Sequence, residues 1–523
     1  MSALLAVAPV IEDPAFTAPV IEYADLAPIL VVLVAAIIGV LIEAFAPPWA
    51  RRTLQLAVAF GGVIVAFGTV VINASSRLLA AQGSVDVDGP ALFLQGTVLL
   101  LAFCGLLLFA ERDIDPAGDA FAPRATALPG SSEERELAVK QVTQTEVYPL
   151  AMFALAGMVL FPAANDMLTM FVALEVLSLP LYLLVGMARR RRLLSQEASL
   201  KYFLLGAFSS AFFLYGVALL YGFSGTVSLA GIGASAGATV GRDPLLLFGV
   251  ALVAVGLLFK VGAVPFHAWT PDVYQGAPTA VTAFMAACTK VAAFGALLRV
   301  FYVALGPVRW DWQPMMWGIA ILTMLVGSIV AITQTDIKRM LAYSAIAHSG
   351  FLLVGVLAVS AQGISSTIFY LLAYGATTIG AFALVTLVRS GSGEASHLSQ
   401  WAGLGRRSPL VAGLFAFYLL SLAGIPLTSG FTAKFAVFSA AVAADSTPLV
   451  IVGVIASAIA AFFYVRVIVL MFFADAAPDG PTVAIPSGMT VTAISVVTVI
   501  SVVLGVFPQP VLDLAEQAGV FLR

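Results

Sequence analysis

The chain has 523 residues, of which 61% are apolar and 10% are charged, and its formal net charge is −3. Soluble domains carry about 25% charged residues, so this composition excludes an ordinary soluble protein. The absence of a long basic run also argues against binding to nucleic acid. The two cysteines, Cys104 and Cys288, lie in apolar segments and are too few for an iron–sulfur cluster or a zinc site. We therefore expect a multi-pass membrane protein.

The apolar residues gather in long runs separated by polar loops. A spanning helix needs about 20 mainly apolar residues, and fourteen runs qualify. Their centres lie near Ala35, Ile64, Leu100, Leu155, Glu175, Phe212, Gly256, Lys290, Thr323, Phe351, Ala376, Ala423, Ala460 and Val497. None reads as a series of strands, so we expect an all-α fold with about 14 transmembrane helices. Residues 1–24 contain acidic residues and lack a basic start, which argues against a cleaved signal peptide.

The loop charges predict the topology, because short cytoplasmic loops concentrate lysine and arginine. One alternating set of loops contains Arg51, Arg52, Arg112, Arg124, Arg135, Lys140, Arg189, Arg190, Arg191, Arg192, Lys338, Arg339, Arg389, Arg406 and Arg407. The other set, together with the tails, contains Arg77, Arg242, Arg309 and Arg523. This asymmetry places both termini on the outer side of the membrane and supports an even number of spans.

Four of the six lysines lie within apolar segments, whereas the loops use arginine almost exclusively. Lys260, Lys290 and Lys434 are close to the middle of their segments, where a lysine costs about 2.5 to 3.5 kcal/mol on insertion scales. Lysine can lose its proton when it is desolvated and arginine does not, so this choice favours a titrating role. Lys201 begins its segment beside a cluster of arginines, and extension to the cytoplasmic surface explains it as well as a relay does.

Glu175 is the one carboxylate near the centre of a segment. The nearest way to keep it ionised is a lysine on a facing helix. Pro180 removes a backbone donor and frees the Val176 carbonyl, which would admit water beside Glu175. A structural ion pair is the alternative, but one pair leaves two central lysines without an explanation.

Two segments are interrupted next to their lysines. Pro265 follows Gly262 in the seventh segment, and Gly424, Ile425 and Pro426 interrupt the twelfth. Interrupted helices at corresponding places in two halves indicate an internal repeat. They also indicate an ion path at the breaks, where freed carbonyls and half-helix ends can face water.

Two of the three histidines lie in or beside apolar runs. His267 follows the first break, and His348 is central in its own segment. Each is either a polar residue bonded to a neighbouring helix or a proton relay, since histidine titrates near neutrality. His397 lies in a loop and receives no role.

Three stretches resemble signatures of one known family. Residues 260–279, KVGAVPFHAWTPDVYQGAPT, look like the seventh-helix motif of the antiporter-like membrane subunits of respiratory complex I. Residues 336–350 and 424–435 resemble two further signatures. The resemblance covers about Tyr148 to Phe473. Gln275, where glutamate is usual, and Leu427, where a proline often follows Pro426, depart from the pattern.

The resemblance implies a division of the chain. Residues 1–145 would be helices 1–3 with a cytoplasmic loop, 146–305 a first repeat of helices 4–8, 306–473 a second repeat of helices 9–13, and 474–523 helix 14 with the tail. The two five-helix repeats would be inverted relative to each other, with helices 7 and 12 broken.

The resemblance also implies a proton path. Glu175 would pair with Lys260, Lys290 would be the central relay and Lys434 the outlet. The further possible relays are His348, which would link the half-channels, His267 and Lys201.

The implied function is proton translocation across the bacterial cytoplasmic membrane, driven by quinone reduction elsewhere in NADH:quinone oxidoreductase. The chain has no phosphate-loop Gly-Lys pair and no dinucleotide glycine pattern, so we expect no cofactor and no redox catalysis within it. NADH, flavin, iron–sulfur clusters and quinone are expected on partner subunits. The expected neighbours are an M-type subunit, small K-type and J-type subunits, and lipids.

Other functions remain open from the sequence. The chain could serve a cation/proton antiporter or a membrane-bound hydrogenase, which sodium dependence or copurifying partners would reveal. It could be a scaffold with structural lysines, in which case neutralising Lys260 and Lys434 together would leave pumping normal. A stand-alone solute transporter would need a substrate pocket that the sequence does not specify.

Overall fold

The computed structural model describes residues 21–115, 118–124, 130–132, 136, 143–239, 241, 243–390, 393–475, 480 and 482–522. Most of the region 1–24, and the loop or tail cations Arg135, Lys140, Arg242 and Arg523, lie outside this part. Within it the chain is mainly helical, and twelve helices are long and apolar enough to cross a membrane. The expected all-α membrane fold is confirmed.

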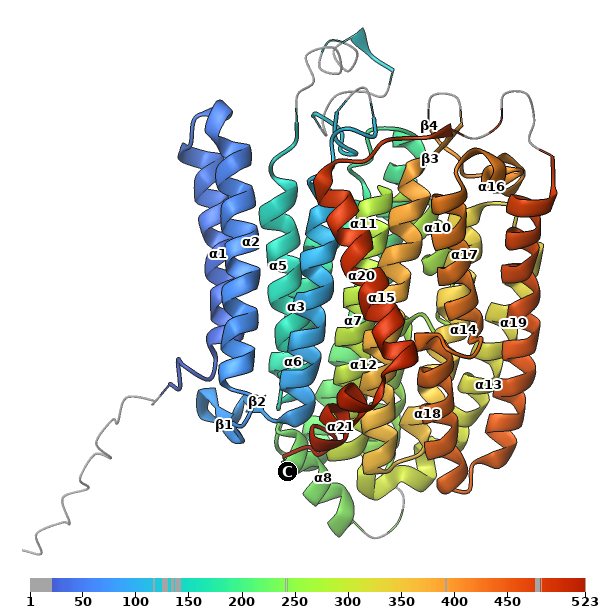
Figure 1. The fold of residues 1–523 in the computed structure, drawn as a ribbon. Coiled ribbons are helices and arrows are strands. Elements are labelled where there is room, and N and C mark those ends of the chain that lie inside the picture. Colours follow the sequence, from blue (N-terminus) through green and yellow to red (C-terminus); the bar gives the residue numbers. More distant parts are fainter. Residues whose placement is uncertain are drawn as a thin grey trace, which may run out of the picture.

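The first half of the chain builds a series of helices, with the longest connection, residues 110–146, between α3 and α5 (Figure 1). These are α1 (Ala27–Phe45), α2 (Pro48–Ile72), α3 (Gly89–Phe109), α5 (Val147–Leu160) with the 3₁₀ turn η2 (Phe161–Ala163), α6 (Met167–Val185), α7 (Arg192–Ser224), α8 (Leu229–Ala238), α9 (Pro244–Val261), α10 (Trp269–Gly276), α11 (Thr279–Phe284), the π-helical turn η3 (Met285–Thr289), α12 (Lys290–Arg299) and the π-helical turn η4 (Val300–Ala304).

The second half continues the same architecture. It contains α13 (Arg309–Thr333), α14 (Ile337–Leu357), α15 (Ala361–Leu387), the 3₁₀ turn η6 (Leu398–Trp401), α16 (Leu404–Arg407), α17 (Pro409–Ala423), α18 (Ser429–Ala443), α19 (Thr447–Phe473), α20 (Gly488–Val506) and α21 (Gln509–Gln517). Short strands occur only in connections: β1 (Leu78–Ala80) pairs with β2 (Val85–Val87), and β3 (Val388–Ser390) pairs with both β4 (Gly393–Glu394) and β5 (Thr482–Val483).

Every predicted segment coincides with a helix or a broken helix. Twelve are the long helices, the segment near Leu155 is the shorter helix Val147–Ala163, and the segment near Ala423 is the pair α17 and α18. The sequence pattern did not predict the short helix α8 or the small strands. The tail after Pro508 forms the short helix α21.

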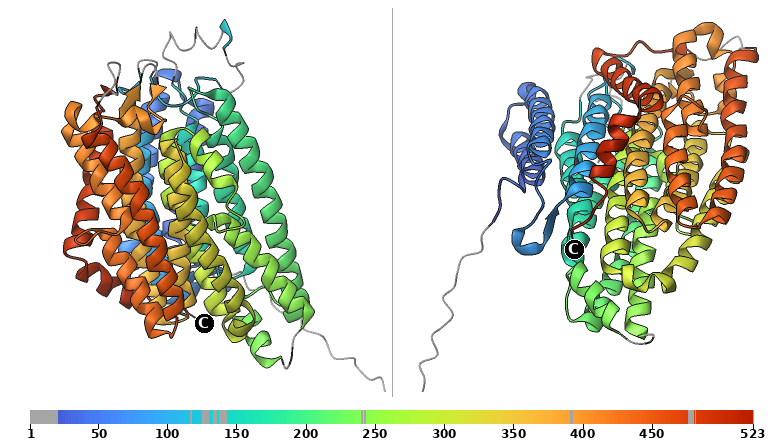
Figure 2. Two further views of the ribbon diagram at one scale, coloured as in Figure 1. Left: turned by 90° about the vertical axis from the view of Figure 1, so that its right-hand side faces the viewer. Right: turned by 60° about the horizontal axis from the view of Figure 1, so that its bottom comes forward.

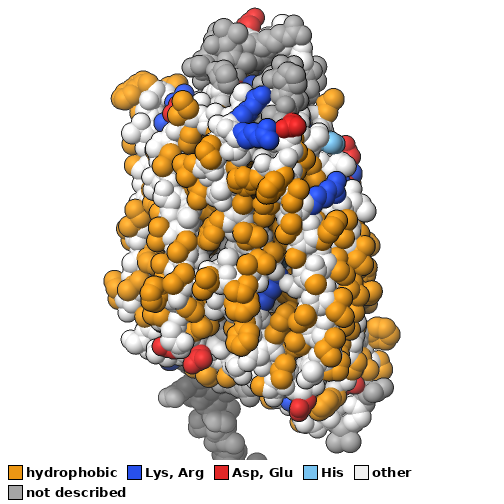
Figure 3. Space-filling view, turned by 45° about the vertical axis from the view of Figure 1, so that its right-hand side comes forward, with side chains coloured by type: hydrophobic (Ala, Val, Ile, Leu, Met, Phe, Trp, Pro, Cys, Tyr) orange, Lys and Arg blue, Asp and Glu red, His pale blue; other side chains and the backbone are white. Residues whose placement is uncertain are grey.

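α15 lies at the centre of the molecule, in contact with α3, α14, α18 and α20. The segment Thr279–Ala304 beside it is wholly buried. α1 and α2 form a hairpin at one edge, which packs against α5 and α3 (Figures 1 and 2). Hydrophobic side chains cover the molecular face in Figure 3, while charged side chains gather mainly toward its two ends. This surface suits a protein that is surrounded by lipid and other membrane helices.

The two ends of the bundle differ in charge. The connections after α1, α3, α6 and α15 lie together at the upper end in Figure 1. Arg112 and Arg189 lie in these connections, Arg51 lies in the first turn of α2 and Arg389 lies in β3. We call this the arginine-rich end. The chain leads into α1 and leaves α21 at the opposite end (Figure 1). α1 therefore begins and α21 ends at the same end of the bundle.

The predicted breaks are present. α9 ends at Val261, where Gly262 takes a left-handed conformation with φ 73°, and α10 begins seven residues later. α17 ends at Ala423, where Gly424 has φ 86°, and α18 begins at Ser429. Glycine adopts these angles without a steric penalty, so each glycine ends its helix and leaves the last carbonyls free of intrahelical partners.

Leu427 provides a test of the second break. It is 76% exposed and has φ 70°, a left-handed angle that costs a leucine about 1 to 2 kcal/mol. Proline cannot adopt this angle, which accounts for its absence here. We expect Leu427→Gly to raise the stability of the purified complex by about 0.5 to 1 kcal/mol in thermal unfolding. Ile425→Gly, in the same loop but with an ordinary φ, should lower it, and an equal gain for both would contradict the argument.

Candidate functional site

Lys260 lies in the last turn of α9, directly before the first break. Its side chain is 5% exposed, and Nζ donates to Ser178 Oγ of α6 at 2.7 Å and to the Tyr202 hydroxyl of α7 at 3.5 Å. The C-terminal end of a helix favours a positive charge, because its unpaired carbonyls carry partial negative charge. The break therefore provides a place for a cation within the span.

Glu175 lies on α6, one turn before Ser178, but it does not form the direct ion pair expected with Lys260. Among the described residues no nitrogen–oxygen contact within 4.0 Å joins the two side chains, and Glu175 Oε1 has no hydrogen-bond partner. Lys260 donates to the Ser178 hydroxyl one turn further along α6 instead, while Glu175 is half-buried with its Oε1 covered. The two groups interact electrostatically without contact.

Lys290 begins α12, directly after the π-helical turn η3. Nζ donates to the Ala345 carbonyl and, at 2.7 Å, to Ser349 Oγ, both on α14. Ser349 Oγ in turn donates at 2.6 Å to the Val261 carbonyl, which is free because α9 ends there. A single serine hydroxyl therefore connects Lys290 to the helix end that carries Lys260.

Lys434 lies on α18, after the second break, and reaches back to the helix before it. Nζ donates to the Leu422 carbonyl at 3.1 Å and to the Ala423 carbonyl at 2.9 Å, which are the last residues of α17. It also donates to Ser457 Oγ of α19 at 2.9 Å. The second break thus holds a lysine at the C-terminal end of a half-helix, as the first does.

His348 lies on α14 between Lys290 and Lys434. Nδ1 is 2.8 Å from the Tyr370 hydroxyl and Nε2 is 3.4 Å from the Tyr464 hydroxyl. Both lysines interact electrostatically with this ring, and the Leu422 carbonyl that accepts from Lys434 also contacts it. Its neighbour Ser349 contacts Lys290, so α14 joins the two breaks.

We call this set of polar groups the thread. It consists of Glu175, Ser178, Lys260, Val261, Ser349, Lys290, His348, Leu422 and Lys434. Hydrogen bonds join Ser178 to Lys260, Lys290 to Ser349, Ser349 to Val261, and Lys434 to Leu422. Glu175 acts on Lys260, and His348 on Lys290, through electrostatic interaction alone. The thread draws on α6, α9, α12, α14, α17 and α18, and it includes the four residues that the sequence placed on the path.

Two further candidates do not join the thread. Lys201 is 44% exposed and forms ion pairs with Glu197 at 2.7 Å and Asp272 at 2.8 Å near the arginine-rich end, so the alternative of a surface lysine is favoured. His267 packs toward Tyr343, with ring centroids 6.5 Å apart, and none of its hydrogen bonds in the described parts reaches a central lysine.

Sequence reasoning missed the hydroxyl groups that hold the lysines and one buried arginine. Ser178 follows Glu175 by three residues and Ser349 follows His348 directly, so proximity to a predicted site residue was the available signal. Arg299 ends the same helix that Lys290 begins and is completely buried.

Arg299 belongs to an ion cluster at the end opposite the arginine-rich one. Its guanidinium contacts Asp86 and, at 2.8 Å, Asp88, and Nε donates to the Pro162 carbonyl at 2.8 Å. Phe521 covers the guanidinium at 4.8 Å, and the Leu522 amide donates to Asp88. Burial raises the pKa of Asp86 to about 6, with Arg299 opposing the shift and Asp88 adding to it. The cluster anchors the C-terminal segment.

The fold and the thread define an antiporter-like membrane subunit. A family model described as NADH:quinone oxidoreductase/Mrp antiporter, TM matches residues 164–460. The structure resembles a chain of respiratory complex I from Thermus thermophilus with a TM-score of 0.75 and 32% identity, covering 94% of this chain and 99% of that one. It also shares its fold with a chain of the Mrp complex from a Dietzia species, with a TM-score of 0.78, 23% identity and coverage of 95% and 97%.

Similar proteins of known identity narrow the class from antiporter-like membrane subunits to one subunit. NADH-quinone oxidoreductase subunit N of Rhodococcus opacus is 61% identical and covers 97% of both chains. The subunit N of Mycobacterium tuberculosis is 57% identical over 97% of this chain and 99% of its own. The chain belongs to the NADH-quinone oxidoreductase subunit N family. The Asp-Val-Tyr and Gly-Ala-Pro-Thr pattern in residues 272–279 and the twelfth-helix lysine resemble that subunit.

Proposed function

We propose that this chain moves protons across the membrane along the buried thread, as a subunit of NADH:quinone oxidoreductase. The observation that carries the proposal is the Ser349 hydroxyl, which joins Lys290 to the carbonyl end of the helix carrying Lys260. Three lysines would be costly in the membrane interior as unconnected charges. The lysine amines, the serine hydroxyls and the imidazole are the groups of the thread that can accept and release protons, and the backbone carbonyls between them orient the donors.

Electrostatic repulsion gives the thread a means of passing charge. Two like charges about 8 Å apart at an effective dielectric constant near 20 repel by roughly 2 kcal/mol. A proton that arrives on one lysine therefore favours release from the next. A change in the distance between Glu175 and Lys260, which are not in contact here, alters the proton affinity of Lys260 and supplies a trigger.

The energy comes from outside this chain. Moving one proton against 100 mV costs about 2.3 kcal/mol. In this proposal NADH, flavin, iron–sulfur clusters and quinone are bound by partner subunits, and quinone reduction there drives the conformational changes transmitted to Glu175. The chain itself performs no redox step.

Two surfaces of the chain support contact with other membrane subunits. Val172 and Leu179 on α6 are 53% and 51% exposed, whereas Glu175 on the same helix is half-buried with Oε1 covered. An exposed apolar face on the helix that carries Glu175 is suited to packing against a helix of a neighbouring subunit. The break loops are also open, with Ile425 41% exposed. Irregular backbone at membrane depth requires protein or water around it. We assign these surfaces to an M-type subunit and the small K-type and J-type subunits.

We infer the orientation from the loop charges. The arginine-rich end faces the cytoplasm and both termini face outward across the bacterial cytoplasmic membrane. The expected units 1–145, 146–305, 306–473 and 474–523 agree with this arrangement, because each proposed five-helix repeat then contains one break. The high identity to subunit N, compared with 23% for the Mrp chain, favours this function over a sodium/proton antiporter.

A double replacement tests the proposal against a purely structural role. In the assembled complex reconstituted into sodium-free liposomes, we expect Lys260→Met with Lys434→Met to lower the protons moved per NADH oxidised. Methionine keeps most of the side-chain volume and removes the charge, so the packing is retained. Lys201→Met is the matched control, because this lysine lies outside the thread, and it should pump normally.

The scaffold interpretation makes the opposite prediction. Unchanged proton pumping by the assembled double variant would show that the lysines only hold the fold. Pumping that requires sodium would instead indicate a cation antiporter.

A further inference from the structure

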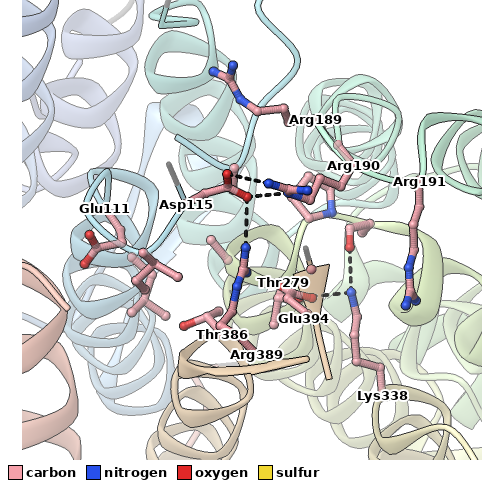
Figure 4. A pocket seen from close by; sticks show the side chains of 18 of the residues that line it. Glu111, Asp115, Arg189, Arg190, Arg191, Thr279, Lys338, Thr386, Arg389 and Glu394 are labelled. Carbon is pink, nitrogen blue, oxygen red and sulfur yellow. Dashed lines mark hydrogen bonds and ion pairs between the residues drawn. The ribbon is translucent and has the colours of Figure 1, made fainter. Parts of the chain in front are cut away.

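A polar cavity opens at the arginine-rich end and is not part of the thread (Figure 4). It has a volume of about 510 Å³ and lies between the α6–α7 connection, α10, α11, α14 and the strand β3. Its charged lining residues are Glu111, Asp115, Arg189, Arg190, Arg191, Lys338, Arg389 and Glu394. A water molecule occupies about 30 Å³ of liquid volume, so a space of this size and polarity holds many waters.

Three side chains at the cavity wall are joined into a hydrogen-bonded chain. Lys338 Nζ donates to Thr279 Oγ1 at 3.1 Å, and Thr279 Oγ1 donates to Glu394 Oε2 at 2.7 Å. Lys338 also donates to the Ala277 carbonyl at 2.7 Å. Lys338 and Thr279 are 4% and 2% exposed, whereas Glu394 is half-buried. This series of hydrogen bonds therefore leads from the accessible Glu394 carboxylate to the buried Lys338 amine.

The inner members of this chain stand on the helices that carry the thread. Thr279 begins α11, which continues through η3 into Lys290 eleven residues later. Lys338 is on the first turn of α14, which carries His348 and Ser349. At 1.5 Å per residue, about 16 Å separates Thr279 from Lys290 along the helix. Thr282, buried in the first turn of α11, follows Thr279 by three residues. At the other end of the interval Lys290 Nζ lies 5.2 Å from the centre of the Tyr374 ring, on α15, which packs against α11 and η3.

We propose that this cavity is the proton uptake chamber of the subunit and that Glu394, Thr279 and Lys338 relay protons from its water toward Lys290. The inference rests on the proposed proton translocation and adds the place where protons enter. It assigns a role to three residues outside the thread.

The relay balances as a cycle. Hydronium in the cavity gives a proton to the Glu394 carboxylate and becomes water. The Lys338 ammonium releases a proton to inner water and hydroxyls leading to the Lys290 amine. The Glu394 O–H then transfers its proton to Thr279 Oγ1 as the Thr279 hydroxyl proton passes to Lys338 Nζ. One proton has moved inward, and all three groups return to their starting states.

Neighbouring charged residues hold the hydrogen-bonded groups Glu394, Thr279 and Lys338 in place. Asp336 and Arg191 are the other charged groups that act on Lys338, and Asp336 also caps the start of α14 through the Lys338 and Arg339 amides. Asp115 bridges Arg190 at 2.5 Å and Arg389 at 2.9 Å across the cavity (Figure 4). Asp115 thus shares its one negative charge between two arginines, and the cavity wall keeps an excess of positive charge.

Thr279→Val tests the relay, since valine keeps the shape of threonine and removes its hydroxyl. In the reconstituted complex we expect proton uptake during NADH oxidation to fall about 10²-fold or more, as for loss of a positioned proton-transfer group. Thr279→Ser keeps the hydroxyl and should pump normally. Thr386→Val is the matched control: Thr386 lines the same cavity, but its hydroxyl donates to the Ala383 carbonyl of its own helix.

Glu394→Ala allows a second measurement, chemical rescue of proton uptake, which would give no rescue if Glu394 had only a structural role. We expect its slow proton uptake to be restored by millimolar formate, a small weak acid that can occupy the cavity and replace the missing proton donor. Normal uptake by Thr279→Val, or a Glu394→Ala defect that formate does not change, would overturn the proposal. Lys290→Met measured in parallel separates the two ideas: if only Lys290→Met is defective, the uptake route is wrong but translocation along the thread stands.

Discussion

Replacing Lys290 by methionine is expected to abolish most proton pumping by the assembled complex while leaving its assembly intact. Lys290 is the only lysine of the thread that contacts Ser349, and the serine connects it to the end of α9. Without the amine no titrating group joins Lys260 to His348. Loss of one positioned proton-transfer group typically lowers a rate by about 10²-fold or more.

The measurement is the number of protons moved per NADH in liposomes, with the amount of assembled complex determined from the same preparation. Lys290→Arg is the informative companion, because it keeps the charge but does not release its proton, and it should be as defective as methionine. Pumping by Lys290→Arg at the normal rate would show that a fixed charge is sufficient and would remove the titrating role.

Replacing Arg299 by methionine is expected to destabilise the chain by about 3 to 5 kcal/mol, because it leaves Asp86 and Asp88 buried without their cation. This loss approaches the whole stability of many proteins, so the variant should accumulate poorly in membranes. The measurement is the level of assembled complex and its thermal unfolding temperature. Arg309→Met is the control, since Arg309 stacks on the exposed Trp310 and holds no buried charge.

Two further conditions should relieve the Arg299→Met defect. Replacing Asp86 and Asp88 by asparagine in the same chain removes the unpaired charges and should restore much of the stability. Lowering the pH should also restore part of the stability of the Arg299→Met variant. With Arg299 present, the folded-state pKa of Asp86 is about 6, above its ordinary value of 3.8, and loss of Arg299, which lowers this pKa, raises it further. The neutral form of Asp86 therefore favours folding at low pH, and this contribution is lost as pH rises through the folded-state pKa. A defect that grows toward acid pH would contradict this assignment.

The path residues could be predicted because the bilayer penalises charge so strongly. Lys260, Lys290 and Lys434 stand out in apolar runs, and the glycines and prolines beside two of them predicted the breaks. What the sequence could not provide was the rotation of each helix about its axis. Glu175 and Ser178 differ by three residues on α6, and this difference decides which of them meets Lys260.

The hydroxyl partners were hidden for another reason. A serine in a membrane helix often bonds to its own backbone, so Ser349 carries no pattern that distinguishes a bridge from a passive residue. Arg299 stayed unnoticed because its carboxylate partners are more than 200 residues away in the chain, in the connection before α3. Contacts of this kind depend on the tertiary fold, whereas the apolar segments and their interruptions are local.

The exposed loops at the two helix breaks affect the abundance of the chain in the cell. Pro265 and Leu427 are exposed and lie in irregular backbone, which is unfavourable next to lipid acyl chains. A newly inserted copy of this chain therefore lacks the protein contacts that these loops require until its partner subunits bind. Such copies are natural targets for the proteases that survey membranes. The abundance of this chain should therefore follow the supply of its partners rather than its own rate of synthesis.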